Sequence, residues 1–238
     1  ETAELRARYA ATVTRVTELE PSGLPPLPGT TGDWTKARRA EVSIDFPLGN
    51  MGPSIPNLLA AVAGNLFDLR EVGALRLVDL DLPQAFADRY PGPRFGVSGT
   101  RQLMGRADGT LLGTIIKPSI GLSPTDLADL VAELAEAGID FIKDDELNGN
   151  PPEAPLAARV AAVMPVLKRY EQAHGRMPMY AFNITDDLSM LERNHDLVRD
   201  AGGTCVMVCV ATIGVAGLEF LRRRSELPIH GHRAMFGA

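Results

Sequence analysis

The feature that most constrains the fold is a regular alternation of short apolar runs and longer helix-like segments that begins near residue 111. The apolar runs predict buried strands and the intervening segments predict amphipathic helices. Strands are expected at residues 111–117, 139–143, 179–184, 204–210 and 227–232, with helices at 124–137, 155–174, 187–200 and 215–225. Strands alternating with helices indicate a parallel sheet, either open or closed into a (β/α)8 barrel. Five strands alone do not decide between the two.

The part of the chain before residue 109 has a different character. Residues 5–19 and 40–46 carry β-branched or alternating residues and are predicted as strands, and residues 75–82 alternate as a half-buried strand does. Residues 57–67 have helical composition. Loops are expected in the Pro/Gly-rich residues 21–29, and residues 90–96 with 99–109 are expected to link two architectural units, 1–108 and 109–238.

Charge and composition exclude some partners. A net charge of −6 and a pI near 5.3, without a sustained basic block, argue against nucleic acid or an anionic membrane. No apolar run approaches the ~20 residues needed to cross a bilayer, and the first residues do not resemble a signal peptide. Cys205 and Cys209 are predicted to be buried free thiols. We therefore expect a cytoplasmic protein.

Chemically reactive residues follow the predicted strands, at the end where parallel α/β proteins build their sites. Lys117 follows the first strand, Asn183 the third, and His230, His232 and Arg233 the fifth. The second strand runs into four charges, Lys143, Asp144, Asp145 and Glu146. Strand alternation places Lys143 and Asp145 on one face and Asp144 on the other. This is a Mg²⁺ site in outline, because Mg²⁺ binds a few carboxylate oxygens together with substrate and water.

Most of these residues also have a purely structural interpretation. Lys117 can be a solvated strand end or an acid/base group tuned by its neighbours. We expect Asp144 to pair with or cap a neighbouring element, and His230 and His232 can both be core residues. Ser119 is expected to be a turn residue. His174 and His195 lie in predicted helices and are expected on the surface.

Three motifs together resemble the RuBisCO large-subunit superfamily, in the same order and on the same strands. They occupy residues 114–123, 138–146 and 230–235, and residues 61–67 resemble the N-terminal segment that lends an asparagine to a neighbouring subunit. The resemblance implies an α/β protein with an N-terminal α+β domain, residues 1–108, followed by a (β/α)8 TIM-type barrel. Residues 109–238 would supply about the first five strands of that barrel. The start of the first domain and the later strands appear to be missing, so the chain is expected to be a fragment or to be incompetent by itself.

The resemblance also implies roles for individual residues. Lys143 would become a carbamate by reacting with CO₂ and would bind Mg²⁺ with Asp145 and Glu146. Lys117 would transfer protons, and His232 and Arg233 would contact substrate hydroxyl or phosphate groups. Substrate binding is also expected of Asn183 on the same rim, and of Asn65 from across a dimer interface. The implied protein is a homodimer or higher homo-oligomer with shared active sites and a phosphorylated small-molecule substrate.

Two departures from true carboxylases point to the RuBisCO-like proteins of form IV. Ser119 stands where carboxylases carry a second lysine, and Phe236 follows the last motif where they carry a histidine. The implied activity is Mg²⁺-dependent enolisation of a phosphorylated ketose or oxo-sugar acid without net carbon fixation. Of the enolase, isomerase and transcarboxylase/hydrolase types in this group, the last is favoured. The alternatives are a genuine carboxylase and a catalytically silent scaffold or binding protein.

Overall fold

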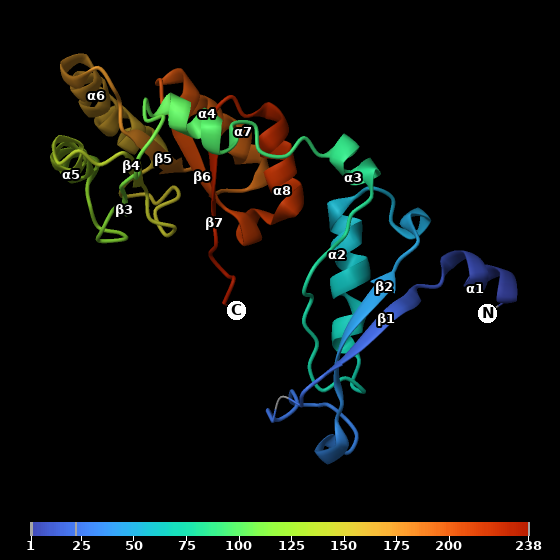
Figure 1. Ribbon diagram of the computed structural model, residues 1–238. Coiled ribbons are helices and arrows are strands. Elements are labelled where there is room, and N and C mark those ends of the chain that lie inside the picture. Colours follow the sequence, from blue (N-terminus) through green and yellow to red (C-terminus); the bar gives the residue numbers. More distant parts are fainter. Residues whose placement is uncertain (1, 22, 238) are drawn as a thin grey trace. The chain divides into compact units, whose positions relative to one another are not determined.

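The computed structural model describes residues 2–21 and 23–237, and the chain divides into two compact units, Glu1–Tyr90 and Pro91–Ala238 (Figure 1). The first unit is built around an antiparallel pair of strands, β1 and β2. Its elements are α1 (Ala3–Tyr9), β1 (Thr12–Leu19), η1 (Trp34–Lys36), β2 (Arg39–Asp45), η2 (Leu48–Asn50), α2 (Ile55–Ala63), η3 (Asn65–Asp68) and α3 (Gln84–Arg89).

Strand β2 and helix α2 follow the predicted pattern. The strand predicted at residues 5–19 is confirmed only over β1, and the one predicted at residues 75–82 is wrong. Residues 5–19 open with helix α1, because residues 3–9 are good helix formers and the Thr2 hydroxyl accepts a hydrogen bond from the Leu5 N–H at 3.3 Å. Residues 75–82 form no strand. A strand needs a neighbour for its backbone groups, and among the described residues of this unit only β1 and β2 pair.

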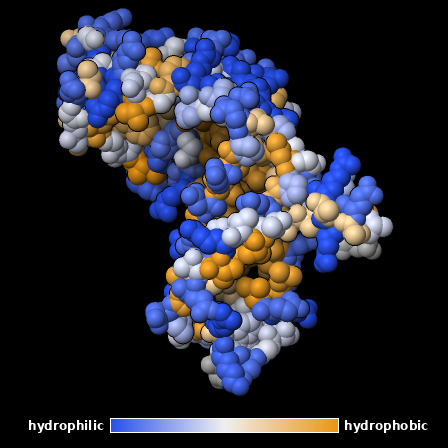
Figure 2. Space-filling view, turned by 45° about the vertical axis from the view of Figure 1, so that its right-hand side comes forward, coloured by the Kyte–Doolittle hydropathy of each residue, from blue (hydrophilic) through white to orange (hydrophobic). Residues whose placement is uncertain are grey.

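The first unit has a small apolar core and much exposed apolar surface. The core packs residues of α2 and α3 against residues near η2: Met51, Leu58, Val62 and Phe86. Large apolar side chains of both strands are exposed, among them Val13, Val16 and Val42. Orange, hydrophobic patches are accordingly visible on the molecular surface (Figure 2). Among the described residues, no helix combines the length and hydrophobicity needed to cross a membrane.

The second unit is a five-stranded parallel sheet in the order β3-β4-β5-β6-β7, with one helix in each crossover (Figure 1). The strands are β3 (Gly113–Ile115), β4 (Phe141–Lys143), β5 (Met179–Asn183), β6 (Cys205–Cys209) and β7 (Ile229–His232). The helices are α4 (Gly96–Leu103), α5 (Pro124–Glu136), α6 (Leu156–His174), α7 (Leu188–Asp200) and α8 (Val210–Arg224). The predicted order of strands and helices is confirmed, and the curled sheet matches the first half of a barrel.

Local signals explain the helix ends. Ser123 caps α5 through a capping box: its hydroxyl accepts a hydrogen bond from the Asp126 N–H, and the Asp126 carboxylate accepts one from the Ser123 N–H. Gly175 ends α6 with a left-handed φ of 72°. The linker expected at residues 99–109 was wrong in part, because α4 occupies its beginning. The glycines of this segment favoured a loop in the prediction. The segment instead begins with a helix, whose C-cap residue Met104 packs against the sheet.

Strand alternation gives the sheet two apolar faces. One face carries Ile142, Tyr180, Phe182, Val206 and Val208, which pack against α5 to α8 in the main core. The other carries Met179, Ala181, Cys205 and Met207, which form a smaller cluster with Met104. We call the second face the inner face. Residues of even number on β5 therefore point to the helices, and residues of odd number point to the inner face.

A buried ion pair closes the N-terminal end of β4. Asp140 is 1% exposed and accepts hydrogen bonds from Arg106 Nε at 2.8 Å, Arg176 NH1 at 3.2 Å and the Leu112 N–H at 3.0 Å. Burial alone would raise the pKa of Asp140. The Leu112 amide and the two guanidinium groups outweigh it, so this pKa lies below its ordinary value.

We predict that Asp140→Asn lowers the free energy of unfolding by about 1–3 kcal/mol at pH 7, because hydrogen bonds to charged groups are lost. A carboxyl group whose pKa is lower in the folded than in the unfolded state stabilises the fold at pH values above its unfolded-state pKa. This stabilisation is lost as the pH falls through the folded-state pKa. The difference between wild type and variant should therefore shrink below about pH 4. Urea unfolding at pH 7 and pH 3 measures it, and an equal difference at both pH values would contradict the assignment.

Candidate active site

The inner face brings the predicted site residues together at the C-terminal edge of the sheet. Lys143 ends β4, Asn183 ends β5, and His232 ends β7, all with inner-face parity. Asp145 and Glu146 follow β4 directly, and Lys117 follows β3. Four separate stretches of sequence therefore meet because parallel strands end at one edge.

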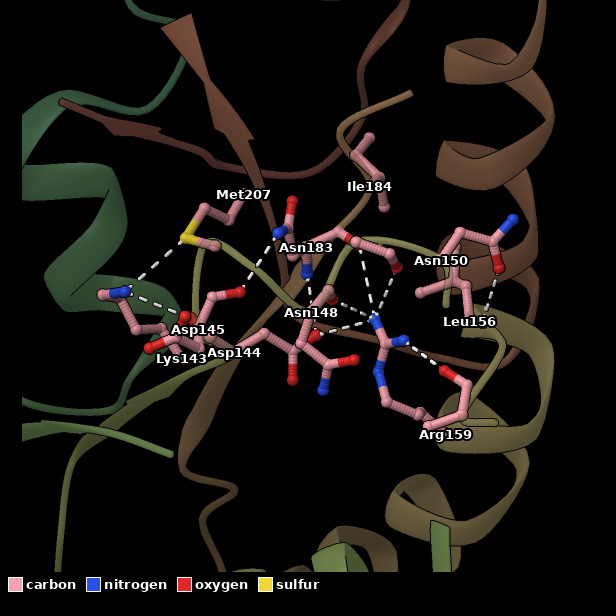
Figure 3. A network of polar contacts seen from close by, with 12 residues as sticks. Lys143, Asp144, Asp145, Asn148, Asn150, Leu156, Arg159, Asn183, Ile184 and Met207 are labelled. Carbon is pink, nitrogen blue, oxygen red and sulfur yellow. Dashed lines mark hydrogen bonds and ion pairs between the residues drawn. The ribbon is translucent and has the colours of Figure 1, made fainter. Parts of the chain in front are cut away.

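Lys143 is half-buried at the end of β4. Its Nζ donates to the Asp144 carbonyl oxygen at 3.1 Å and lies 3.8 Å from Met207 Sδ on the inner face (Figure 3). Burial lowers the pKa of Lys143, although the carboxylates of Glu146, Asp145 and Asp144 oppose that shift. A lowered pKa increases the fraction of neutral, nucleophilic amine at a given pH.

Asp145 is almost fully buried and forms a compact triangle with Lys117 and Ser119. Lys117 Nζ donates to Asp145 Oδ2 at 2.6 Å, and the Ser119 hydroxyl donates to the same oxygen at 3.0 Å. Burial alone would raise the pKa of Asp145, but the bonds from Lys117, the Leu147 amide and Ser119 hold it below its ordinary value. The same bond raises the pKa of the exposed Lys117. Lys117 is thus a charged hydrogen-bond donor to Asp145, and Ser119 contacts both side chains in addition to its place in the turn.

Glu146 and His232 face each other across the edge of the sheet. His232 Nε2 lies 3.6 Å from Glu146 Oε2. On the other side of the ring, His232 Nδ1 accepts a hydrogen bond from the Ala234 N–H at 3.2 Å and lies 3.8 Å from Cys209 Sγ. When the ring is neutral, its proton therefore sits on Nε2 and points toward Glu146.

The Asn183 side chain binds the backbone of the loop that carries Asp145 and Glu146, which we call the acidic loop. It does not bond the two carboxylates. The side-chain amide of Asn183 donates to the carbonyl oxygens of Asp145 and Glu146, each at 3.1 Å. Its own Oδ1 accepts from the Thr185 N–H at 3.0 Å. The amide is buried, so these bonds fix the direction in which the loop leaves β4.

Asp144 points to the opposite face, as strand alternation predicts, and enters a network that sequence reasoning missed. It is fully buried beside Arg159 of α6, whose NH2 donates to Asp144 Oδ2 at 3.1 Å. The Tyr180 hydroxyl donates to Asp144 Oδ1 at 2.6 Å, and the Asn183 N–H donates to Oδ2 at 2.9 Å. Burial raises the pKa of Asp144 above its ordinary value, and these three donors oppose that rise. An arginine on the apolar side of a predicted helix is the signal that could have located the network.

The other predicted residues differ in their exposure. Asn65 is exposed at the start of η3 in the first unit, and Arg233 is exposed after β7. His230 packs against Phe141 with ring centroids 5.3 Å apart, and burial lowers its pKa. His174 is partly exposed as expected, but the expectation for His195 was wrong. His195 is buried in α7 with its Nδ1 3.0 Å from Asp196 Oδ1.

The donor set suits a hard cation but does not complete a site by itself. Asp145 and Glu146 supply carboxylate oxygens, the ligands that Mg²⁺ prefers. Within residues 2–21 and 23–237, no three His, Cys, Asp or Glu side chains are grouped closely enough to hold a metal ion. A third protein oxygen would have to come from another group, and Lys143 is the adjacent residue able to acquire one as a carbamate.

Comparison with known proteins gives two family matches that together span most of the chain. Residues 11–86 match the ribulose bisphosphate carboxylase large chain, N-terminal domain, and residues 96–238 match the catalytic domain of the same large chain.

Individual relatives agree with these matches. The chain is 50% identical over 237 residues to the 3-oxo-isoapionate-4-phosphate transcarboxylase/hydrolase of Xanthobacter autotrophicus, covering 100% of this chain and 57% of that protein. It is 44% identical to the 3-oxo-isoapionate-4-phosphate decarboxylase of Rhizobium rhizogenes, covering 98% and 56%. A rubisco-like protein from Burkholderia fungorum has a crystal structure similar to this one, with a TM-score of 0.91, 48% identity and coverage of 98% and 58%. The chain thus spans little more than half the length of these relatives.

We predict that both cysteines react slowly with iodoacetamide in the folded protein. Both thiols are free and buried, and burial raises the pKa of Cys205 to about 12 and that of Cys209 above its ordinary value. Because the thiolate is the reactive form, alkylation at pH 8 should be slower than in urea by on the order of a thousandfold at Cys205. Mass spectrometry of each cysteine peptide measures the rates, and equal rates in the two states would contradict the burial.

Proposed function

Because the chain belongs to the ribulose bisphosphate carboxylase large-chain family, we propose that its protein catalyses a Mg²⁺-dependent enolisation without net carbon fixation. The proposed substrate class is a phosphorylated ketose or oxo-sugar acid. The observation that carries the proposal is the convergence of Lys117, Lys143, Asp145, Glu146 and His232 at one edge of a parallel sheet.

In this proposal Lys143, as a carbamate formed with CO₂, holds Mg²⁺ together with Asp145 and Glu146. When bound, Mg²⁺ would act as a Lewis acid and would stabilise the negative charge that develops on a substrate carbonyl oxygen when a neighbouring C–H proton leaves. Lys143 and Asp145 occupy neighbouring inner-face positions and Glu146 follows them in the loop, whose backbone the Asn183 side chain binds.

Lys117 and His232 are the proposed proton-transfer groups. Lys117 donates a hydrogen bond to Asp145 Oδ2, so as an ammonium it can give a proton, and it would first have to lose that proton before it could accept one from substrate. His232 presents its Nε2 proton beside Glu146, where it can bond a substrate hydroxyl. Arg233 and Asn65 are proposed to contact substrate, Asn65 from the partner in a homodimer or higher homo-oligomer.

The transcarboxylase/hydrolase type is favoured over a carboxylase. Ser119 bonds both Lys117 and Asp145, so it fills the space beside Asp145 with a short neutral hydroxyl where a carboxylase carries a second lysine. Two relatives covering nearly the whole chain act on 3-oxo-isoapionate 4-phosphate, as a transcarboxylase/hydrolase and as a decarboxylase. A phosphorylated branched oxo-sugar acid is therefore the first substrate to test.

The test is deuterium incorporation from D₂O into a panel of phosphorylated ketoses and oxo-sugar acids, with Mg²⁺ and bicarbonate, using the protein at its native length. Exchange that depends on Mg²⁺ is expected, and ¹⁴CO₂ should not be fixed into product. Fixation of ¹⁴CO₂ would show a carboxylase. The absence of exchange from every compound would favour a binding protein that keeps the motif as structure.

We predict that Lys143→Ala reduces Mg²⁺-dependent exchange by more than about 100-fold, because the change removes the carbamate ligand. Lys168→Ala, a change at an exposed lysine of α6, is the matched control and should leave exchange unchanged. NMR of the substrate α-proton in D₂O measures both variants. Wild-type exchange in Lys143→Ala would rule out the carbamate.

A further inference from the structure

The loop that carries Asp145 and Glu146 is folded around a single buried cation. Arg159 is 0% exposed, and its guanidinium reaches from α6 toward the end of β4 (Figure 3). NH1 donates to the Ala154 carbonyl oxygen at 2.7 Å, and NH2 donates to the carbonyl oxygens of Asn148 and Gly149, each at 2.9 Å. The same NH2 also donates to Asp144 Oδ2 at 3.1 Å.

These contacts restrict the loop because a buried guanidinium must be surrounded by acceptors. An uncompensated buried charge costs several kcal/mol, so the carbonyl groups of residues 148, 149 and 154 are held turned inward. This leaves little freedom to the short segment 145–147, which is fixed at one end by β4 and at the other by Arg159. The Asn148 N–H closes the segment by donating to the Asp145 carbonyl oxygen at 3.1 Å.

Asp144 connects Arg159 to the end of β5 through hydrogen bonds. Its carboxylate accepts from both Arg159 and the Asn183 N–H, and the Asn183 side chain in turn holds the carbonyl groups of Asp145 and Glu146. The approach of the two loops is close: a Cβ on Gly149 would lie 3.1 Å from the Thr185 carbonyl oxygen. Arg159 therefore acts on the acidic loop by two routes, one through backbone carbonyls and one through Asp144.

We propose that Arg159 is a positioning residue that sets the affinity of the Asp145–Glu146 pair for a divalent cation, without touching cation or substrate. The identity of the cation rests on the proposed function. The hydrogen bonds from Arg159 to the loop are independent of that proposal. Arg159 faces the helix side of the sheet, away from the inner face, so its effect can only be indirect.

The opposite end of β4 offers a matched control. Asp140 is as buried as Asp144 and also pairs with arginine, but the pair closes the N-terminal end of the strand, away from the acidic loop. Arg106 has 42% of its side chain exposed and Asp140 keeps Arg176 when Arg106 is replaced, so Arg106→Gln controls for the loss of an arginine–aspartate pair at the other end of the strand. A positioning contribution should also change metal binding and loop motion, which Arg106 does not reach.

The experiment compares Arg159→Gln, Arg159→Lys and Arg106→Gln in the protein at its native length. Mn²⁺ binding in the presence of bicarbonate, followed by electron paramagnetic resonance, should weaken about 10- to 100-fold in Arg159→Gln. Arg159→Lys should recover part of this loss, because it restores the charge without the planar fork. Arg106→Gln should lower the melting temperature and leave Mn²⁺ affinity unchanged.

Amide hydrogen exchange without metal tests the positioning separately from the cation. The N–H groups of Leu147 and Asn148, which bond to Asp145, should exchange faster in Arg159→Gln than in wild type. The Gly203 N–H, bonded to the Val198 carbonyl oxygen in the turn before β6, should keep its rate. If Arg159→Gln does not fold, Tyr180→Phe replaces it, since this change removes only the hydroxyl that orients Asp144.

The outcomes separate the two proposals. Wild-type Mn²⁺ affinity and unchanged exchange at Leu147 and Asn148 in a folded Arg159 variant, or in Tyr180→Phe, would overturn the positioning role. Failure of the wild-type protein itself to bind Mn²⁺ would overturn the proposed metal site, and the exchange rates would still decide the role of Arg159.

Discussion

The site depends on one buried ion pair, between Asp144 at the end of β4 and Arg159 in α6. Neither side chain touches solvent, so each charge needs the other and a set of surrounding dipoles. Those dipoles come from the Tyr180 hydroxyl, the Asn183 amide and carbonyl groups of the loop after β4. The polar network in the helix-side core therefore determines the conformation of the chain segment that carries the reactive carboxylates.

Strand parity separates this support from the chemistry. Lys143 and Asp145 point to the inner face, whereas Asp144 between them points to the helices. The apolar clusters obey the same division, with Tyr180 and Phe182 on the helix side and Ala181 and Met207 on the inner side. Because adjacent residues of a strand face opposite ways, the end of β4 places Asp144 in the core and places Lys143 and Asp145 at the polar edge of the sheet.

Much of this arrangement follows from local sequence patterns. The order of strands and helices after residue 111, the Ser123 cap and the opposite directions of Lys143 and Asp144 all depend on periodicity and neighbouring residues. Arg159 and His195 were not predicted as buried, because burial depends on how each helix packs in the folded structure and not on residue type alone. The alternation at residues 75–82 predicted a strand, but a strand also requires a neighbour, which periodicity does not report. Substrate identity depends on groups that this cluster does not contain.

The parity of β4 also limits how the site can change in length. Residues 143–145 alternate between inner face and core, so a single inserted or deleted residue would exchange the two sets. The Lys143 ammonium would then enter the space opposite Arg159, and Asp144 would move into the open edge of the sheet. At the end of this strand, only a change of two residues would keep Lys143 and Asp144 on their present faces.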